Sequence, residues 1–249
     1  MELLGEIIAV ASGKGGTGKT SVCAAVATAL ADAGERVLCL DCDVGLRNLD
    51  ISLGLSELEA ISFLEVCRGD YDLRQAVTHP AFANLSFLTA PVSCHAGQIE
   101  PEAFSAMVRR ARRVFDYIFL DAPAGVDAGL ELVCAPADRV LLVTGADPAA
   151  VRDAGRTGQV LQQLGQERVK LIINRVRPKM VASMALTLDD VMDGAGLPLL
   201  GVVPEDENVV LAAAFGKPLL RYNRRSSAAA ACKRIAKRIQ GMYVPLPVK

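Results

Sequence analysis

A run of glycines and lysines near the start of the chain has the residue types and spacing needed to bind phosphate. This run, which is followed directly by Ser21, reads Gly13-Lys14-Gly15-Gly16-Thr17-Gly18-Lys19-Thr20. The glycines permit a tight turn that points backbone N–H groups at phosphate oxygens, and a helix that starts here adds its positive end. Lys19 would reach the terminal phosphates, and the Thr20 hydroxyl would ligate Mg²⁺. Most glycine-rich stretches are plain loops, but every fixed position of a P-loop is filled, so we expect residues 13–21 to bind a nucleotide.

Two aspartates at the ends of predicted strands could complete a magnesium site. Asp121 ends the apolar run Tyr117–Leu120, and Asp43 follows the run that ends at Asp41. Either acid alone fits an ordinary turn at the end of a strand. Because both accompany a complete P-loop, we predict that Asp121 holds Mg²⁺ or its water shell and that Asp43 and Thr20 complete the metal site.

These residues belong to a chain in which predicted strands and helices alternate. Strands are predicted at Glu6–Ala11, Arg36–Asp41, Leu85–Ala90, Tyr117–Asp121, Arg139–Thr144, Val169–Asn174 and Leu199–Pro204. Helices are predicted at Lys19–Ala33, Pro101–Val114, Val151–Leu164, Leu186–Ala195, Glu207–Phe215 and Ser226–Gln240. This alternation predicts an α/β fold, a doubly wound and mostly parallel sheet of about seven or eight strands with helices on both faces, as in P-loop NTPases. The carboxyl ends of such strands share one edge, where chemistry gathers.

The composition fits one large domain of this class. The chain has 249 residues, of which 51% are hydrophobic and 4% aromatic, so Val, Leu, Ile and Ala would build the core, as in buried parallel strands. No break in composition divides it, so we expect a single domain over residues 1–249 with a short non-helical tail at 242–249, where two prolines oppose a helix. The net charge of −1 gives no overall attraction to nucleic acid or anionic membrane. Neither a leader nor a membrane-spanning run is predicted, so we expect a cytoplasmic protein.

The seven cysteines and two histidines are not predicted to form a site. Cys39 and Cys42 have C-x-x-C spacing, but residues three apart on a strand point to opposite faces, and no second pair exists to complete a zinc site. We therefore expect reduced, packed thiols. His79 and His95 have no neighbours at ligand spacing and are assigned no role.

The P-loop carries a second lysine, Lys14, directly after its first glycine, although an ordinary P-loop needs only one. Lys14 could be a solvated loop charge, as most lysines are. The pattern Lys-Gly-Gly-x-Gly-Lys-Thr from Lys14 to Thr20, however, resembles the deviant Walker A motif of the MinD/ParA family of ATPases. The resemblance implies a Mg²⁺-dependent ATP hydrolase that forms a homodimer when ATP is bound. Lys14 would then reach the nucleotide of the partner subunit, and Asp43 would orient the attacking water.

Further segments are similar to the MinD branch of this family. Residues 41–50 read Asp-Cys-Asp-Val-Gly-Leu-Arg-Asn-Leu-Asp, whereas ParA-type proteins have proline and glutamine after the second aspartate. Residues 121–125, Asp-Ala-Pro-Ala-Gly, resemble switch II, which senses the γ-phosphate. In switch I, Asn48 would lie near the same phosphate. The amide of Asn174, with Arg175, matches the adenine-reading position. The resemblance places further residues at the nucleotide: Pro204, Glu205 and Asp206.

The resemblance covers Met1 to about Gly241, but two departures bear on the site. Relatives often carry a hydroxyl residue where this chain has Ala122, so a contact to water or Mg²⁺ could be weaker. The family has a Pro-Glu pair at the dimer interface, where this chain reads Ala146-Asp147-Pro148. Whether the shorter Asp147 bridges subunits is left open by the sequence.

The resemblance also implies a function and partners. Such an ATPase is slow and acts as a switch, because ATP assembles the dimer and hydrolysis, stimulated by a protein partner, releases it. In the MinD branch, the dimer at the inner face of the cell membrane recruits a division inhibitor and so places the division septum. The alternatives are a flagellar-number or ParA-like partition ATPase and, from a different class, a regulatory module that holds nucleotide with little turnover.

Basic residues gather at the end of the helix predicted from Pro101. There they favour the negative end of the helix dipole, and no aromatic residues interleave with them, so we expect a solvated face and no specific nucleic-acid binding. The cluster comprises Arg109, Arg110, Arg112 and Arg113.

A second basic segment lies in the predicted helix Ser226–Gln240. Cys232, Ile235 and Ile239 recur there at helical spacing, with lysines and arginines beside them. The apolar face could anchor the chain to a membrane or pack into the core. Because it lacks Phe, Trp and Leu, we predict a core helix and membrane binding that is weak or depends on a partner.

Overall fold

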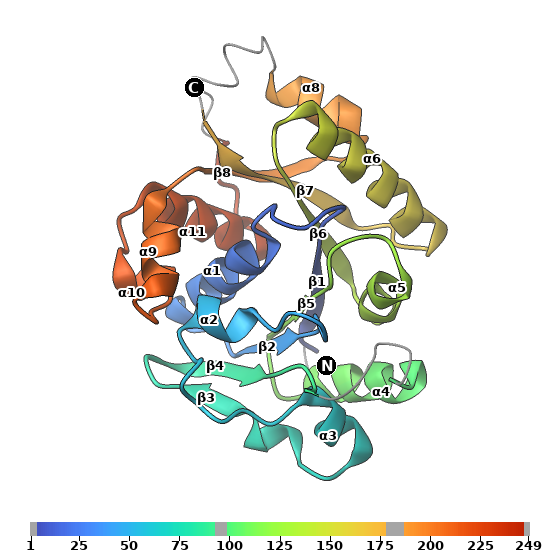
Figure 1. Cartoon of the computed structure of the whole chain (residues 1–249), viewed down its shortest axis with the longest axis vertical. Coiled ribbons are helices and arrows are strands. Elements are labelled where there is room, and N and C mark those ends of the chain that lie inside the picture. Colours follow the sequence, from blue (N-terminus) through green and yellow to red (C-terminus); the bar gives the residue numbers. More distant parts are fainter. Residues whose placement is uncertain (1–3, 93–98, 178–186, 247–249) are drawn as a thin grey trace.

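The described residues include eight strands, which form one sheet in the order β3-β4-β2-β5-β1-β6-β7-β8 (Figure 1). The computed structural model describes residues 4–92, 99–177 and 187–246. The strands are β1 (Glu6–Ala11), β2 (Val37–Asp41), β3 (Val77–His79), β4 (Phe82–Leu88), β5 (Tyr117–Asp121), β6 (Arg139–Thr144), β7 (Val169–Val176) and β8 (Leu199–Pro204). Only β3 pairs antiparallel, with β4, among the described strands. The predicted mostly parallel α/β sheet is therefore confirmed.

Helices cover both faces of the sheet (Figure 1). One face, on the left in that view, carries α1 (Lys19–Asp32), α2 (Leu49–Leu53), α9 (Glu207–Ala214), α10 (Leu219–Tyr222) and α11 (Ser227–Ile239). The other face carries α3 (Phe63–Arg68), α4 (Pro101–Ala111), α5 (Ala128–Cys134), α6 (Pro148–Gln163) and α8 (Leu188–Ala195). A 3₁₀ turn, Leu73–Gln75, leads into β3.

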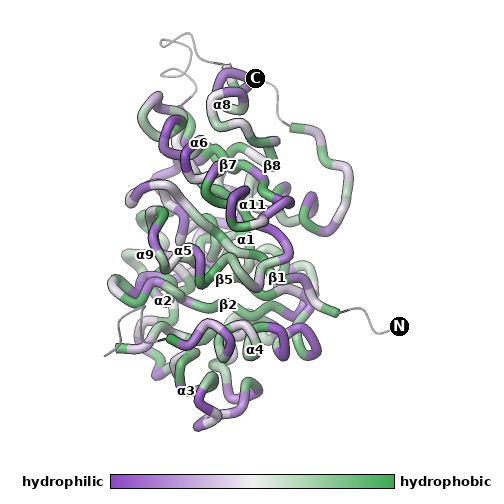
Figure 2. Tube along the Cα trace, turned by 90° about the vertical axis from the view of Figure 1, so that its right-hand side faces the viewer, coloured by the Kyte–Doolittle hydropathy of each residue, from purple (hydrophilic) through white to green (hydrophobic). Residues whose placement is uncertain are grey.

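Successive side chains of each strand point to opposite faces of the sheet, and this alternation gives one hydrophobic core on each face. In β1, Ile7 and Ala9 pack into the core under α4, α5 and α6, whereas Ile8 and Val10 pack into the core under α1 and α11. All four are fully buried. Figure 2 shows the consequence, because the strands through the middle are coloured hydrophobic and the hydrophilic residues lie mainly on helices and loops.

Two strand predictions need correction. The strand predicted at Leu85–Ala90 begins earlier, at Phe82, because it forms a hairpin with the three-residue β3, which is too short to be recognised in the sequence. The strand predicted to end at Asn174 continues to Val176. Its pairing with β8 shifts register between Ile173 and Val176, which indicates a bulge at that point.

The helices that the sequence analysis missed are short. α2, α3, α5 and α10 span four to seven residues, so they show too few turns for a 3.6-residue period. One local signal could have found α3, because Ser62 and Glu65 form a capping box, the side chain of each accepting the other's backbone N–H. α6 begins at Pro148, three residues before the predicted start, because Asp147 caps it.

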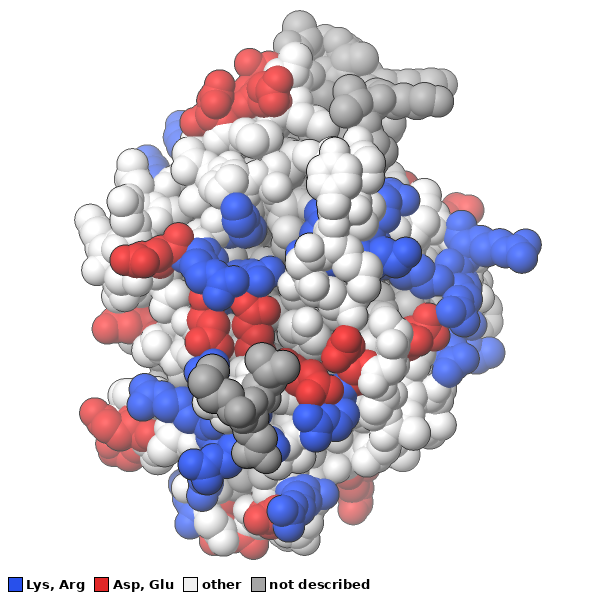
Figure 3. All heavy atoms as spheres, turned by 180° about the vertical axis from the view of Figure 1, so that it is seen from behind, with Lys and Arg blue, Asp and Glu red and all other residues white. Residues whose placement is uncertain are grey.

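The C-terminal helix α11 is a core helix, as predicted. Cys232, Ile235 and Ile239 are at most 4% exposed and belong to the core under α1. Figure 3 shows Lys and Arg side chains gathered along its right-hand edge, the side of the molecule on which α9, α10 and α11 lie in Figure 1. After this helix, residues 242–246 form no further helix. Among the described residues, no helix has both the length and the apolar character needed to cross a membrane.

The basic cluster at the end of α4 is partly structural. Arg109 and Arg110 are exposed, as expected of a solvated face. Arg112 differs, because its guanidinium donates to the Gly5 carbonyl at 2.8 Å and lies 3.3 Å from the Asp138 carboxylate. Arg112 therefore ties the residue before β1 and Asp138 to the end of α4.

Candidate functional site

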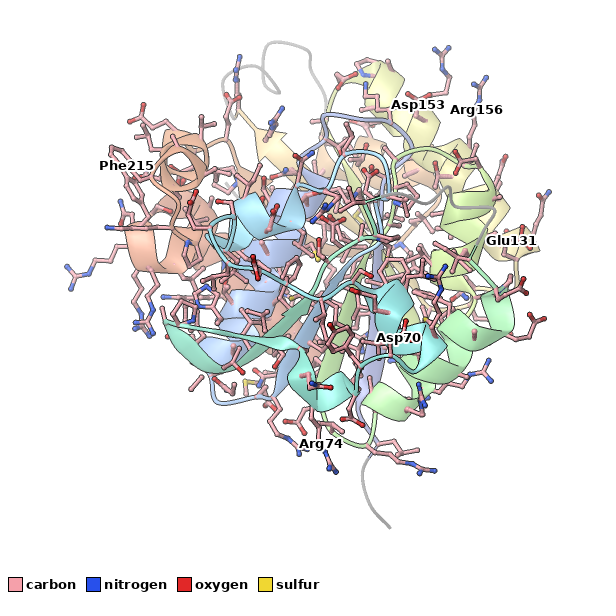
Figure 4. All side chains as sticks on the ribbon, turned by 60° about the horizontal axis from the view of Figure 1, so that its bottom comes forward. Asp70, Arg74, Glu131, Asp153, Arg156 and Phe215 are labelled. Atoms are coloured by element: carbon pink, nitrogen blue, oxygen red, sulfur yellow. The ribbon has the colours of Figure 1, made fainter. Side chains whose placement is uncertain are left out.

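The P-loop, residues 13–20, connects β1 to α1 at the carboxyl edge of the sheet. Gly16 and Gly18 have φ angles of 79° and 82°, in the left-handed region that favours glycine. Gly13 is required for a different reason, since a Cβ there would lie 2.7 Å from the Asp153 carbonyl oxygen of α6. The Thr157 hydroxyl of the same helix would lie 2.6 Å from that Cβ, whereas Figure 4 shows the side chains of Asp153 and Arg156 on the outer side of α6. The predicted tight turn is confirmed.

Lys19, in the first turn of α1, pairs with Asp121 at the end of β5. The Lys19 Nζ lies 2.7 Å from Asp121 Oδ1, and the side chains are 7% and 1% exposed. Burial raises the pKa of Asp121, and the charge of Lys19 and its hydrogen bond oppose the rise. Strands β1 and β5 are neighbours, with Val10 opposite Asp121, so the sheet itself brings the P-loop to Asp121.

The residues predicted to hold Mg²⁺ fit that ion. Among the described residues, the Oδ2 atom of Asp121 and the Oγ1 atom of Thr17 are buried without a hydrogen-bond partner. The Thr20 hydroxyl lies 3.4 Å from Lys19 Nζ, and Asp43 is close enough for its charge to raise the pKa of Asp121. Mg²⁺ uses one or two carboxylates together with substrate phosphates and water. The described part of the chain holds no group of three or more His, Cys, Asp or Glu side chains that could bind a metal alone.

Switch I follows β2 and carries two of the predicted residues. Asp43 Oδ1 accepts from the backbone N–H groups of Gly45 and Leu46, both at 3.3 Å. Asn48 is the N-cap residue of α2, but its side chain makes no cap hydrogen bond. Beneath the loop, burial raises the pKa of Asp41 to about 7, while two backbone hydrogen bonds oppose the rise.

A cavity of about 670 Å³ beside the P-loop can accept the base of a nucleotide. The predicted residues that line it are Gly18, Ser21, Asn174, Arg175, Glu205 and Asp206. Val209 of α9 and Leu219 of α10 add apolar walls. The sequence analysis did not identify these two, because only long-range packing places their helices beside α1.

Asn174 and Arg175, in the bulged end of β7, brace the P-loop. The amide nitrogen of Asn174 donates to the Thr17 carbonyl at 2.8 Å, and the guanidinium of Arg175 donates to the Gly16 carbonyl at 2.9 Å. Arg175 has a φ of 54°, a strained value for a residue other than glycine. Both residues therefore contact the loop itself, and adenine recognition by them stays a prediction.

Pro204, Glu205 and Asp206 end β8 and lead into α9. The Glu205 carboxylate pairs with Arg177. Asp206 caps α9 by accepting from Asn208 and also accepts from the hydroxyl of Ser227 and the backbone N–H of Ala228 in α11. Burial alone would raise the pKa of Asp206, but these hydrogen bonds outweigh it and hold the pKa well below its usual value. Asp206 thus clamps two helices at the wall of the base cavity.

Lys14 is half exposed and points toward Asp147 of the same chain. Its Nζ lies 3.6 Å from Asp147 Oδ1. Asp147 is also the N-cap of α6, accepting from the backbone N–H of Ala150, and that bond together with Lys14 lowers its pKa. The arrangement joins the second P-loop lysine to α6 within one subunit, and a bridge between subunits stays a prediction.

The described cysteines and His79 join no group of side chains that could bind a metal. Cys39 and Cys42 are both buried but belong to the two different cores, as predicted. The His79 ring is held by the Leu53 carbonyl and the Ala81 N–H.

A larger cavity, of about 1220 Å³, lies between α6, α8 and the amino ends of β6 and β7, and none of the predicted site residues lines it. His95 lies outside the described residues.

The family model of the CobQ/CobB/MinD/ParA nucleotide binding domain matches residues 8–219, which include the P-loop and both predicted metal-site aspartates. The chain belongs to this family. The MinD/ParA resemblance of the P-loop is thereby confirmed, and the MinD branch is supported by relatives along nearly the whole chain. Septum site-determining protein MinD of Thermotoga maritima is 38% identical over 247 residues, covering 98% of this chain and 91% of its own length.

Solved structures of MinD have the same fold. The MinC:MinD cell division protein complex of Aquifex aeolicus superposes with a TM-score of 0.89 at 32% identity, covering 98% of both chains. MinD of Pyrococcus horikoshii, complexed with Mg-ADP, gives a TM-score of 0.83 at 28% identity and covers 95% of this chain and 96% of its own. The family member described here therefore shares both the sequence pattern and the strand arrangement of MinD.

Proposed function

We propose that this chain is a slow, Mg²⁺-dependent ATPase that works as a dimerising switch and places the division septum. The observation that carries the proposal is the buried Lys19–Asp121 pair at the P-loop, with Asp43 beside it. Septum site-determining proteins named MinD match almost the full chain, and one MinD structure contains Mg-ADP. Residues 41–50 favour this branch over partition and flagellar-number ATPases.

The chemistry assigns a task to each residue at this edge. Backbone N–H groups of the P-loop and the Lys19 cation bind the phosphates of ATP. Asp121 and Thr20 hold Mg²⁺, which when bound neutralises charge on the phosphate oxygens. Asp43 orients the attacking water and accepts its hydrogen bond. The cavity between α1, α9 and α10 takes the base.

The switch requires two subunits and a partner. We propose that ATP drives a homodimer in which Lys14 of each subunit contacts the other nucleotide, and that hydrolysis releases the dimer. The MinC:MinD complex supports a division inhibitor similar to MinC as one protein partner, beside a separate protein that stimulates hydrolysis. The dimer would act in the cytoplasm and reach the inner face of the membrane weakly or through a partner.

Measurements of ATP hydrolysis and of dimer formation test the biochemical part of this proposal. We expect turnover of Mg-ATP by the purified chain well below about 10 s⁻¹, a typical enzyme value. Light scattering should show a dimer with ATP but not with ADP, most clearly in the Asp43→Ala variant, which retains ATP. Turnover at ordinary rates without any partner would contradict the switch, and no turnover under any condition would favour a regulatory nucleotide-binding module.

Septum position tests the cellular part. Cells that encode this chain, once deprived of it, should place septa away from their normal position, and wild type should restore placement where Lys19→Ala does not. Flagellar number and plasmid loss are measured in the same cells. Normal septa with altered flagella or lost plasmids would assign the chain to one of the other positioning pathways.

A further inference from the structure

Asp41 is a buried acid at the site for which the proposed chemistry has no use. It is the last residue of β2 and is fully buried. Its Oδ1 accepts the backbone N–H of Asp43 at 3.0 Å, and its Oδ2 accepts the backbone N–H of Leu49 at 3.0 Å. Leu49 is the first residue of α2. One carboxylate therefore holds both ends of residues 43–48, the loop that forms switch I.

We infer that Asp41 is a positioning residue for ATP hydrolysis, because its two oxygens fix both ends of the loop that carries Asp43 and Asn48. This inference rests on the proposed function. A carboxylate is needed for the task, since it has two acceptor oxygens and no donor. An amide offers one acceptor, and its NH₂ group would face the second backbone N–H.

A third anchor holds the middle of the same loop. Arg47 has a φ of 48°, one of two positive values among the described residues other than glycine, and its backbone N–H donates to the Asp43 carbonyl at 3.1 Å. Its guanidinium donates to the Thr89 hydroxyl from Nη2 at 3.0 Å and from Nε at 3.3 Å. Thr89 is 5% exposed and receives no other role in the site. Strain of this kind persists only where surrounding contacts impose it.

The three anchors hold one segment, and none of their hydrogen bonds reaches the P-loop, although the charges of Lys19 and Asp121 act on Asp41. The hydrogen bonds of Asp41 in the described structure go to residues 43 and 49, whereas Lys19 pairs with Asp121. Weakening Asp41 should therefore loosen switch I while the phosphate-binding lysine keeps its place. A merely structural acid would instead lower stability and leave catalysis unchanged in the folded fraction.

Hydrogen exchange and kinetics test this in the full chain. In wild type without nucleotide, the amides of Asp43 and Leu49 should exchange slowly. Asp41→Asn should speed exchange in residues 43–49 and leave α1 unchanged. With Mg-ATP, we expect kcat to fall about tenfold or more while KM changes less than about threefold. Thr89→Val removes only the hydroxyl that accepts from Arg47, and it should lower kcat by a smaller factor.

Asp138→Asn is the matched control. Asp138 also accepts a backbone N–H, from Ile7 at 2.8 Å, but it lies at the opposite edge of the sheet beside Arg112. It should lower stability and leave kcat unchanged. Wild-type kcat in folded Asp41→Asn, or unchanged exchange in residues 43–49, overturns the inference. If Asp41→Asn does not fold, wild-type kcat in Thr89→Val overturns it. If wild type does not hydrolyse ATP, the proposed function fails, and the exchange arm alone decides whether Asp41 fixes the loop.

Discussion

Lys19 and Asp121 form a buried ion pair, with 2.7 Å between Nζ and Oδ1, between the start of α1 and the end of β5. Such a pair is costly to break, because removal of one partner leaves the other charge buried without compensation. The pair therefore joins phosphate binding to stability. The same two side chains that are placed to meet a nucleotide also hold the central strand against the first helix.

Lys19→Ala should abolish tight ATP binding and destabilise the fold by about 3 kcal/mol at neutral pH. Without Lys19, burial keeps the folded-state pKa of Asp121 above its unfolded value, so the folded state binds more protons between the two values. Stability of the variant relative to wild type should therefore fall as pH rises above about 4. Urea denaturation at about pH 5 and about pH 8 measures the difference.

Two further variants separate charge from packing. Lys19→Ala combined with Asp121→Asn should recover part of the lost stability, since no charge is then buried alone. Lys14→Ala, a change to a half-exposed lysine of the same loop, should alter stability by less than about 0.5 kcal/mol. If Lys19→Ala lowered the free energy of unfolding equally at both pH values, the buried charge of Asp121 would not be the cause of the lost stability.

Lys14→Ala should leave nucleotide binding by the monomer within about threefold of wild type and abolish the ATP-dependent dimer. The reason is its position, because Lys14 lies on the α6 side of the loop beside Asp147 and away from the Lys19–Asp121 pair. Equilibrium binding of a fluorescent ATP analogue and light scattering in an Asp43→Ala background are the measurements. A full dimer of Lys14→Ala with ATP would remove the proposed contact across subunits.

Asp147→Asn serves as the companion variant. Asparagine retains the N-cap of α6 but removes the charge that faces Lys14. Altered dimerisation with unchanged melting temperature would then report the release of Lys14 rather than damage to the helix. Loss of stability without any change in dimerisation would show that the Lys14–Asp147 contact has no part in assembly.

The fold and the phosphate-binding half of the site could be predicted from sequence because their signals are local. The P-loop is one contiguous segment, and Asp121 ends an apolar run that any buried strand would show. Arg175 and Asp206 were harder to interpret, since their roles depend on a bulge and on a helix more than twenty residues away. The position of Asp41 in its motif is visible in the sequence, but its two hydrogen bonds to the loop depend on the fold of residues 42–49.

Asp206→Ala should lower the free energy of unfolding by about 2 kcal/mol at neutral pH, because the carboxylate caps α9 and also accepts hydrogen bonds from the first turn of α11. Its folded-state pKa lies below the unfolded value, so the unfolded state binds more protons in that window. The contribution is fully present above about pH 4 and is lost as pH falls toward the folded-state pKa. The gap between wild type and variant should therefore shrink at about pH 3.

Denaturation with urea at the two pH values measures that gap. Glu205→Ala is the control, because the neighbouring Glu205 is exposed and pairs with Arg177 rather than with a helix end. It should change stability little. A gap for Asp206→Ala that stays constant from neutral to acid pH would contradict the clamp by an ionised carboxylate.

Membrane binding by this chain should be weak and sensitive to salt. The apolar face of α11 is buried in the core, with Ile235 fully buried and Cys232 1% exposed, so only the basic face can meet a lipid surface. Each lysine or arginine near an anionic surface contributes about 1 kcal/mol, and salt screens that attraction. Sedimentation with anionic liposomes should show little pelleting of the monomer and more of the ATP dimer, whose two basic faces act together.

Two variants distinguish a core helix from a membrane anchor. Lys233→Glu combined with Lys237→Glu should remove the remaining pelleting and lower the melting temperature only slightly, because Lys237 is exposed and the partly exposed Lys233 donates from its Nζ to the Arg224 carbonyl at 3.3 Å. Ile235→Glu should instead unfold the protein or lower its melting temperature strongly, since it places a carboxylate against Gly201 of β8. Strong pelleting that survives about 0.5 M salt, and that Ile235→Glu abolishes in a protein still folded by circular dichroism, would show that α11 leaves the core to bind the membrane.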